Sequence, residues 1–196
     1  MKETAVLRAQ RKRLKTAMVA ATAELGYAEV TIAEIVRRAR VSRQAFYAQF
    51  DSKEECYLST ADSGVRYLIN RMSAAVLSNG HSDGSLTSFL RTTVRSYLQA
   101  CREEPEFTRF LVVESLAAGL KIAEQRNEVM MTLARQIAAA HRAARPDAPP
   151  YSELTYLGAV GAMSELVYRY ALAHKIDRIG ELEKPFLELL EGLLTR

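Results

Sequence analysis

Two adjacent polar side chains near residue 44 have the chemistry that is needed to read DNA bases. Arg43 can donate a pair of hydrogen bonds to guanine, and Gln44 can pair in a similar way with adenine. Phe46 and Phe50 follow at a spacing of four residues, which places both rings on one face of a helix. With these rings in a hydrophobic core, Arg43 and Gln44 would face outward, toward a groove of a duplex.

Further side chains around this pair are suited to binding phosphate. The hydroxyls of Thr31 and Tyr47 and the ammonium of Lys53 can contact the DNA backbone, and such contacts fix the register of a protein on a duplex. Thr31 and Ser42 are also good N-cap residues. The unpaired N–H groups of the two helices that begin after them would add further donors for phosphate.

Three short helices must hold these side chains in place. Apolar residues recur at helical spacing from Leu14 to Leu25, and Gly26 can take the left-handed conformation that ends a helix. A second helix is expected over residues 32–39 and a third over residues 42–50, joined by a tight turn. Residues 32–51 therefore predict a helix-turn-helix.

The residue types and spacing of this segment are shared with a known family. They are Gly26-Tyr27, Thr31-Ile32-Ala33-Glu34-Ile35, Val41-Ser42, Phe46-Tyr47, Phe50 and Ser52-Lys53-Glu54. Because of these residues, the segment from about residue 10 to residue 58 resembles the TetR family of bacterial transcriptional regulators. The resemblance implies that Thr31, Tyr47 and Lys53 hold the DNA backbone, while Arg43 and Gln44 read bases.

The turn between the second and third helices departs from this family. Arg40 stands where the family usually has Gly. A positive φ at this position would cost an Arg roughly 1 kcal/mol. Either the turn differs slightly or the protein tolerates the strain, and Arg40 then becomes a further candidate for contact with phosphate.

The charge of the chain is unevenly distributed. Residues 1–50 contain ten Lys and Arg against four Glu, a net charge of +6, whereas all 196 residues together carry +4. Such a basic segment indicates contact with a polyanion, either nucleic acid or an anionic membrane. The plain alternative is a solvated basic tail.

The whole chain predicts an all-α protein of about nine helices, without strands or internal repeats. The later helices are expected over about 53–77, 85–101, 105–119, 121–142, 151–173 and 181–194, with a loop at 79–84 and a stiff linker at 145–150. We predict a DNA-binding domain over 1–52 and a helical domain over 53–196, joined by the helix that begins at Lys53. The resemblance implies that this second domain binds a ligand and forms a dimer.

Small residues and a wide apolar stripe near the C-terminus favour a homodimer. Gly158 and Gly161 permit close approach of a partner helix, and the last helix carries Phe186, Leu189, Leu190 and Leu193. Two subunits would pair their recognition helices with a palindromic operator in double-stranded DNA. The alternative is that the stripe is buried inside a monomer.

Soft and aromatic side chains over residues 107–170 suit a pocket for an apolar small molecule. The candidates are Phe107, Phe110, Glu114, Met130, Leu133, Ile137, Tyr156 and Met163. An ordinary core would contain the same residue types. Glu114 interrupts an apolar run, so its carboxylate would either receive a cationic or hydroxylated ligand or pair with an arginine such as Arg91 or Arg95.

Several other classes of protein are disfavoured. His81, His141 and His174 lie far apart in the sequence, and Cys56 and Cys101 have no metal or redox spacing. We therefore expect no catalytic residue, no metal and no cofactor. The longest stretches without charge are too short to span a membrane, and the N-terminus lacks the apolar core of a secretory signal, so we expect a cytoplasmic protein with unpaired thiols and no membrane partner.

Together these features predict a homodimeric DNA-binding transcriptional regulator. We expect a repressor that an unknown small-molecule effector releases from its operator. The alternatives are a ligand-independent regulator or an activator with the same DNA-binding domain, and, in another class, a module that binds membrane surfaces.

Overall fold

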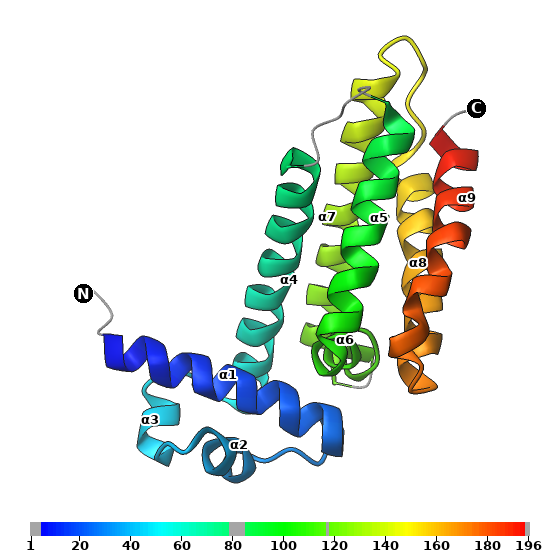
Figure 1. Cartoon of the computed structure of the whole chain (residues 1–196). Helices are drawn as coiled ribbons and strands as arrows, with labels where there is room; N and C mark the ends of the chain where they lie inside the picture. The colour runs from blue at the N-terminus through cyan, green and yellow to red at the C-terminus, as the bar shows by residue number, and fades with distance from the viewer. Residues whose placement is uncertain (1–4, 79–84, 117, 195–196) are drawn as a thin grey trace. The chain divides into compact units, whose positions relative to one another are not determined.

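The computed structural model describes residues 5–78, 85–116 and 118–194, and every regular element among them is a helix. The elements are α1 Ala5–Leu25, α2 Ile32–Ala39, α3 Arg43–Tyr47, α4 Lys53–Ser78, α5 Leu86–Glu103, α6 Pro105–Val112, the 3₁₀ helix η1 Glu114–Leu116, α7 Leu120–Ala144, α8 Glu153–Leu172, the 3₁₀ helix η2 Ile176–Leu182 and α9 Glu183–Leu194 (Figure 1). The predicted all-helical class is confirmed. The loop predicted at 79–84 lies outside the described residues.

Local signals explain most helix ends. Gly26 ends α1 with a φ of +78°, and the hydroxyl oxygens of Thr31 and Ser42 cap α2 and α3 by accepting N–H groups of their first turns. Pro105 occupies the first position of α6, where its missing N–H costs nothing.

Three elements differ from the sequence prediction. The third helix was expected to reach residue 50, but α3 ends at Tyr47. The sixth helix was expected to end near residue 119, but α6 ends at Val112 and the chain continues as η1. Residues 176–182 form η2, whereas the sequence predicted only a helix from about 181. In η2 the buried residues Ile176, Ile179 and Leu182 recur every three positions, which is the period of a 3₁₀ helix.

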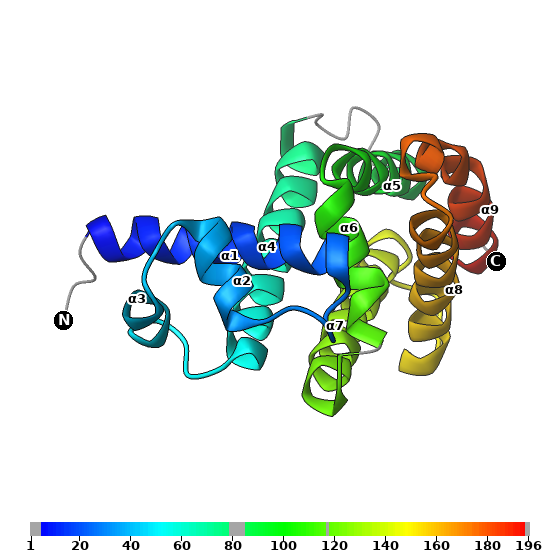
Figure 2. The same ribbon diagram turned by 90° about the horizontal axis from the view of Figure 1, so that it is seen from below.

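The chain divides into two compact units. The first contains Met1–Val65 and Glu106–Gln125, so α6, η1 and the start of α7 join the three N-terminal helices. Within this unit α2 crosses near the middle of α1, and α3 lies near the N-terminal half of α1 (Figures 1 and 2). Its core contains Leu14, Met18, Ala21, Val30, Ile35, Phe46, Phe50, Cys56, Tyr57, Phe110, Ala118 and Ile122.

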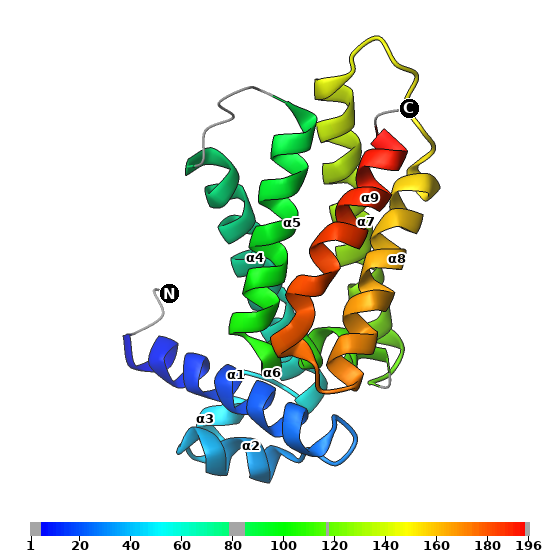
Figure 3. The same ribbon diagram turned by 45° about the vertical axis from the view of Figure 1, so that its right-hand side comes forward.

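The second unit contains Arg66–Pro105 and Arg126–Arg196. Its helices α5, α8 and α9 and the main part of α7 run side by side (Figures 1 and 3). Helix α5 packs against η2 and α9, and α8 packs against the same two elements. Large buried side chains here include Leu90, Tyr156, Val167, Ile179, Phe186 and Leu194. The predicted domain boundary at residue 52 stays a prediction.

None of the described helices combines the length and apolar character that a membrane span requires.

Candidate nucleic-acid interface

Helix α3 presents its polar side chains outward from a buried aromatic anchor. Phe46 is fully buried, and its ring lies 5.7 Å from the ring of Phe50. Arg43 and Gln44 are exposed at the N-terminal end of α3, as the sequence predicted. Tyr47 is 55% exposed and meets Phe46 edge to face at 5.5 Å, so its ring is held while its hydroxyl remains accessible.

The two N-cap hydroxyls lie at the exposed starts of α2 and α3. The Thr31 oxygen accepts the Glu34 N–H at 3.2 Å, and the Ser42 oxygen accepts the Ala45 N–H at 3.1 Å. Each hydroxyl serves here as an acceptor and still has its own hydrogen to donate to a phosphate oxygen. Contact of either residue with phosphate stays a prediction.

The turn between α2 and α3 contains a strained residue. Arg40 has φ 53° and ψ 51°, which is the left-handed conformation that Gly adopts without cost. The turn is closed by the Val41 N–H, which donates to the carbonyl oxygen of Val36 at 3.1 Å. Of the two possibilities left open by the sequence, the protein tolerates the strain. The Arg40 side chain is exposed.

Lys53 is placed differently from the other predicted phosphate contacts. Its Nζ donates to the carbonyl oxygens of Tyr27 at 2.9 Å and Val30 at 2.8 Å, with Ala28 at 3.4 Å, and lies 4.3 Å from the centre of the Tyr27 ring. Desolvation by burial lowers the pKa of Lys53. The ammonium thus fastens the α1–α2 loop to the start of α4, and a contact of Lys53 with phosphate stays a prediction.

Two arginines of α2 are neutralised within the first unit. The Glu34 carboxylate accepts hydrogen bonds from Arg37 and Arg38, and Arg38 also pairs with Glu24 at 2.9 Å. The hydrogen bonds from these two guanidinium groups hold the pKa of Glu34 at about 2, below its usual value of 4.5. Arg37 and Arg38 therefore stabilise the helix rather than adding free positive charge to the surface.

Three of the predicted pocket residues lie in the first unit and pack it. Phe110 is fully buried and stacks on Tyr57 at 4.0 Å, and the Tyr57 hydroxyl donates to the Phe110 carbonyl oxygen at 2.6 Å. Phe107 lies half-buried against Gly64 of α4. Phe110 is thus a core residue, which was the alternative left open by the sequence.

Glu114 has a structural partner that its sequence context did not reveal. Its buried carboxylate accepts the Tyr27 N–H at 3.0 Å and lies 3.5 Å from Nη2 of Arg109. Pairing with an arginine was one expected outcome, but the partner is Arg109 rather than Arg91 or Arg95. This contact joins η1 to the loop after α1, across 87 positions of the chain. No local pattern could have indicated it.

The other five predicted pocket residues lie in the second unit. Tyr156 is buried and its hydroxyl lies 2.7 Å from Nδ1 of His141. A Cβ on Gly161 would lie 3.8 Å from Cε of Met130. The remaining candidates are half-buried, namely Leu133, Ile137 and Met163.

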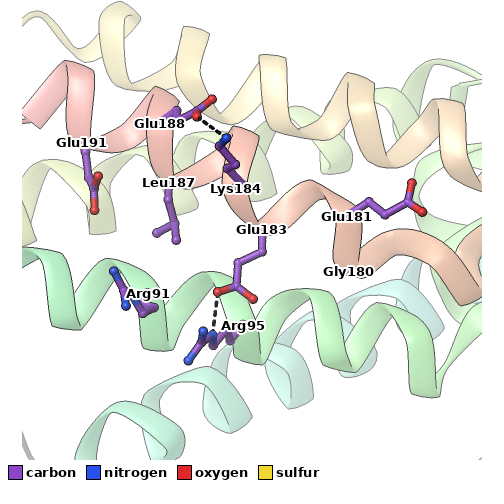
Figure 4. Close-up of a pocket in the computed structure, with 9 residues that line it drawn as sticks. All are labelled: Arg91, Arg95, Gly180, Glu181, Glu183, Lys184, Leu187, Glu188 and Glu191. Carbon is purple, nitrogen blue, oxygen red and sulfur yellow. Dashed lines mark hydrogen bonds and ion pairs between the residues drawn. The ribbon is translucent and has the colours of Figure 1, made fainter.

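A groove of about 560 Å³ in the second unit has a different lining. Charged residues of both signs dominate it, and Arg95 pairs with Glu183 at 2.6 Å (Figure 4). The lining residues are Arg91, Arg95, Gly180, Glu181, Glu183, Lys184, Leu187, Glu188 and Glu191. This groove contains none of the predicted pocket residues, so it is not the predicted apolar site.

The candidate dimer residues separate into core and surface. Phe186 and Leu190 are 1% and 3% exposed inside the second unit, so they pack its own core and offer no surface to a partner. That part of the expected interface is corrected. Leu189 is exposed and Leu193 is half-exposed. Gly158 is exposed as well, and a Cβ built on it would meet no atom within 4 Å.

Comparisons with known proteins agree with this geometry. Residues 16–60 match the family model described as "Bacterial regulatory proteins, tetR family". The chain is similar to the fatty acid degradation regulator FadR of Bacillus halodurans, with a TM-score of 0.82 and 17% identity over 98% of each chain. No curated protein matches the sequence.

Two further solved structures have the same fold. One is FadR of Bacillus subtilis in complex with stearoyl-CoA, with a TM-score of 0.79 and 16% identity over 91% of this chain and 96% of that one. The other is the regulatory protein TetR of Rhodobacter sphaeroides, with a TM-score of 0.69 and 21% identity over 91% of this chain and 97% of that one. At these identities the likeness establishes the fold.

The family model spans the helix-turn-helix whose exposed recognition residues are described above, and the fold extends over nearly the whole chain. Residues 16–60 are therefore a DNA-binding domain of the TetR family of bacterial regulatory proteins, and the chain as a whole has the fold of the solved regulators named above.

Proposed function

We propose that this regulator is a homodimeric repressor that binds a palindromic operator and leaves it when a small apolar effector binds. The observation that carries the proposal is the outward face of α3, where Arg43, Gln44 and Tyr47 stand exposed around the buried ring of Phe46. Arg43 and Gln44 would read base edges in the major groove. Thr31, Arg40, Ser42 and Tyr47 would hold the backbone on either side.

A second copy of the chain is the proposed occupant of the outer face of α8 and α9. Leu154 and Leu172 of α8 are 73% and 49% exposed, and Leu189 of α9 is 37% exposed. Gly158 and Gly161 keep part of this face low, which permits close approach of two helices. A two-fold pair would present two copies of α3 to the two halves of a palindrome.

An apolar effector is supported by residue type and by a relative. The half-buried Met130, Leu133, Ile137 and Met163 are soft or branched side chains that can rearrange around an apolar molecule. The Bacillus subtilis relative was solved with stearoyl-CoA, whose acyl chain is apolar. Long-chain acyl-CoA is therefore the first compound class to test. The alternatives remain a ligand-independent regulator or an activator.

Selection from random duplexes tests the DNA-binding part of this proposal. We expect recovery of an inverted repeat, and Arg43→Ala should cost about 1–3 kcal/mol of binding free energy while relaxing one position of each half-site. A Glu124→Ala variant, changed at an exposed residue of α7, serves as the control. An Arg43→Ala protein that weakens every sequence by the same factor would contradict the assigned role in base reading.

Titration with stearoyl-CoA tests the effector part. A molecule that loosens operator binding a hundredfold must bind the DNA-free state more tightly by roughly 2.7 kcal/mol. Operator DNA must then weaken binding of that molecule by the same factor. Free CoA, which lacks the acyl chain, is the matched control. Operator binding that is unchanged by stearoyl-CoA and by a panel of apolar compounds would favour the ligand-independent alternative.

A further inference from the structure

The cations of the basic N-terminal segment fall into two groups in the structure. Arg37 and Arg38 are neutralised by glutamates, as described above. Arg11 and Lys15 point inward and donate to neutral groups, among them the Gln49 carbonyl oxygen at 3.0 Å and the Ser59 carbonyl oxygen at 2.8 Å. The second group is exposed, and among the described residues its side chains have no hydrogen-bond or ion-pair partner; it comprises Arg8, Lys12, Arg13, Arg40 and Arg43.

The exposed cations of α1 have no acidic residue beside them in the described part of the helix before Glu24. Residues 5–23 contain no Asp or Glu, and the first turn of α1 has no acidic residue to interact with the helix dipole. Arg8 and Lys12 are one turn apart, and such a like-charge pair costs a few tenths of a kcal/mol. Arg11 adds charge to the same helix, because its hydrogen-bond partners, Gln49 and Ser59, are neutral. The folded protein therefore keeps a mutually repelling cluster that an external anion would stabilise.

This cluster is held next to the recognition segment, by which we mean α3 and the residues up to Phe50 that follow it. The Gln49 side chain donates to the Leu7 carbonyl oxygen at 2.9 Å, while Arg11 donates back to Gln49 and lies 4.5 Å from the centre of the Phe50 ring. The N-terminal half of α1 is thus tied to the residues that directly follow α3 (Figures 1 and 2). A duplex docked on α3 would have its backbone close to this part of α1.

We propose that Arg8 and Lys12 form a second phosphate-binding surface, which contacts the DNA backbone beside the bases that α3 reads. The inference rests on the docking of α3 in the proposed function. Its ligand is the phosphate backbone of duplex DNA, because the exposed groups are cations without acceptors and are placed at the recognition segment. These contacts add affinity for all duplexes and carry no sequence information.

The test is the salt dependence of DNA binding by the full chain, measured on the selected operator and on a scrambled duplex. For Arg8→Ala with Lys12→Ala we expect the slope of log affinity against log salt to fall by about 1.8, which is two phosphate contacts. The variant should therefore lose roughly 60-fold more affinity at 0.1 M salt than it loses at 1 M salt. This loss should be the same for the operator and for the scrambled duplex.

The matched control is Arg142→Ala with Lys175→Ala, which removes two exposed charges of the second unit and lowers the net charge equally. If both double variants reduce the slope alike, the effect is general charge and the proposal is wrong. An unchanged slope for the α1 variant, or a loss confined to the operator, also overturns it. Salt-dependent binding of the wild-type chain to anionic phosphatidylglycerol vesicles that the α1 variant loses, with an unchanged DNA slope, would assign the surface to membranes.

Two further measurements keep the outcome interpretable. Thermal unfolding should show the α1 variant at least as stable as the wild type, because repulsion is relieved; if it unfolds, Arg8→Gln with Lys12→Gln replaces it and the same slopes decide. A wild-type chain that selects no duplex would defeat the proposed function itself. A wild type that selects an operator, with an α1 variant of equal slope, defeats only this inference.

Discussion

Arg40 has opposite effects on two properties: its backbone conformation lowers the stability of the fold, while its charge would strengthen DNA binding. Its left-handed backbone costs an Arg roughly 1 kcal/mol, and this cost persists although Gly would remove it. The exposed guanidinium beside the N-terminus of α3 offers a reason, since a cation at this turn can reach a phosphate. We infer that the strain is retained for the charge.

Replacing Arg40 separates these two effects. Arg40→Gly should raise the free energy of unfolding by up to about 1 kcal/mol, reduced by the greater freedom of Gly in the unfolded chain, and should weaken binding to all duplexes. Arg40→Lys keeps the charge and the strain and serves as the control. Urea unfolding and a DNA titration on the same samples give both values. A glycine variant that binds DNA as tightly as the wild type would remove the phosphate role.

Lys53 should behave as a structural residue. Lys53→Ala would leave the carbonyl oxygens of Tyr27 and Val30 without their donor, so we expect a loss of roughly 1–3 kcal/mol in the free energy of unfolding. Lys12→Ala, which removes an exposed cation, should change stability by less than about 0.5 kcal/mol. Denaturant unfolding of both variants measures this. Equal stability of the two proteins would show that the Lys53 contacts contribute nothing.

At the scale of elements, α4 and α6 pack with almost no space between them. A Cβ at Gly64 would overlap three ring carbons of Phe107, so this position of α4 requires a residue without a side chain. Tyr57, two turns earlier on α4, adds its hydrogen bond to the Phe110 carbonyl. The close approach of these two helices holds α6 within the first unit.

Enlarging Gly64 and shortening Phe107 tests this packing. Gly64→Ala should lower the free energy of unfolding by about 1–3 kcal/mol or more, because the methyl group forces the ring aside. Combining it with Phe107→Ala should recover part of that loss, since the ring no longer occupies the space. A double-mutant cycle of urea unfolding measures the coupling. Additive losses would mean that the two positions do not meet.

Helix α2 should have its own response to acid. The folded-state pKa of Glu34 is lowered to about 2 from a usual 4.5, so its contribution is fully present above pH 4.5 and is lost as the pH falls toward 2. Glu34→Gln should therefore melt at a lower temperature than the wild type at pH 7 and at the same temperature near pH 2. Melting followed by circular dichroism at both pH values checks this. A difference that persists at pH 2 would indicate a cause other than the carboxylate charge.

These elements also show which structural features could be predicted from the sequence. Helix ends at Gly26, Thr31, Ser42 and Pro105 were predictable because a cap or a terminator acts on its nearest neighbours. The outward placement of Arg43 and Gln44 followed from the spacing of two phenylalanines. The period of three at Ile176, Ile179 and Leu182 was visible as well, and it was the signal for η2 that helical spacing of 3.6 concealed.

The remainder depended on contacts between distant parts of the chain. Phe186 and Leu190 carry the same residue types as a dimer seam, and only the packing of α9 on α5 shows that they are internal. Glu114 could not be paired with Tyr27 from sequence, and neither could Lys53 with the carbonyl groups of the α1–α2 loop. In each case the residue type indicated which interactions the side chain can make, but its actual partner depends on the tertiary structure.

For the whole molecule, Gly158 offers a sharp test of the dimer. Because a Cβ there meets no atom within 4 Å, Gly158→Glu should leave the subunit folded and even favour its helix, yet place charge in the proposed interface. We expect monomers by light scattering and loss of operator binding, with Gly158→Ala remaining dimeric as the control. A glutamate variant that stays dimeric would place the interface elsewhere.

The first unit is built from two separate stretches of the chain, 1–65 and 106–125, and this has a consequence for its folding during synthesis. Its core includes Phe110, Ala118 and Ile122, so a nascent chain that ends at residue 65 lacks part of the apolar surface that Tyr57 and its neighbours require. Ribosomes add about 5–20 residues per second, so the 60 residues from 66 to 125 take roughly 3–12 s to appear. During this interval the half-finished unit exposes apolar surface, and a synthetic fragment of residues 1–65 should share that weakness permanently.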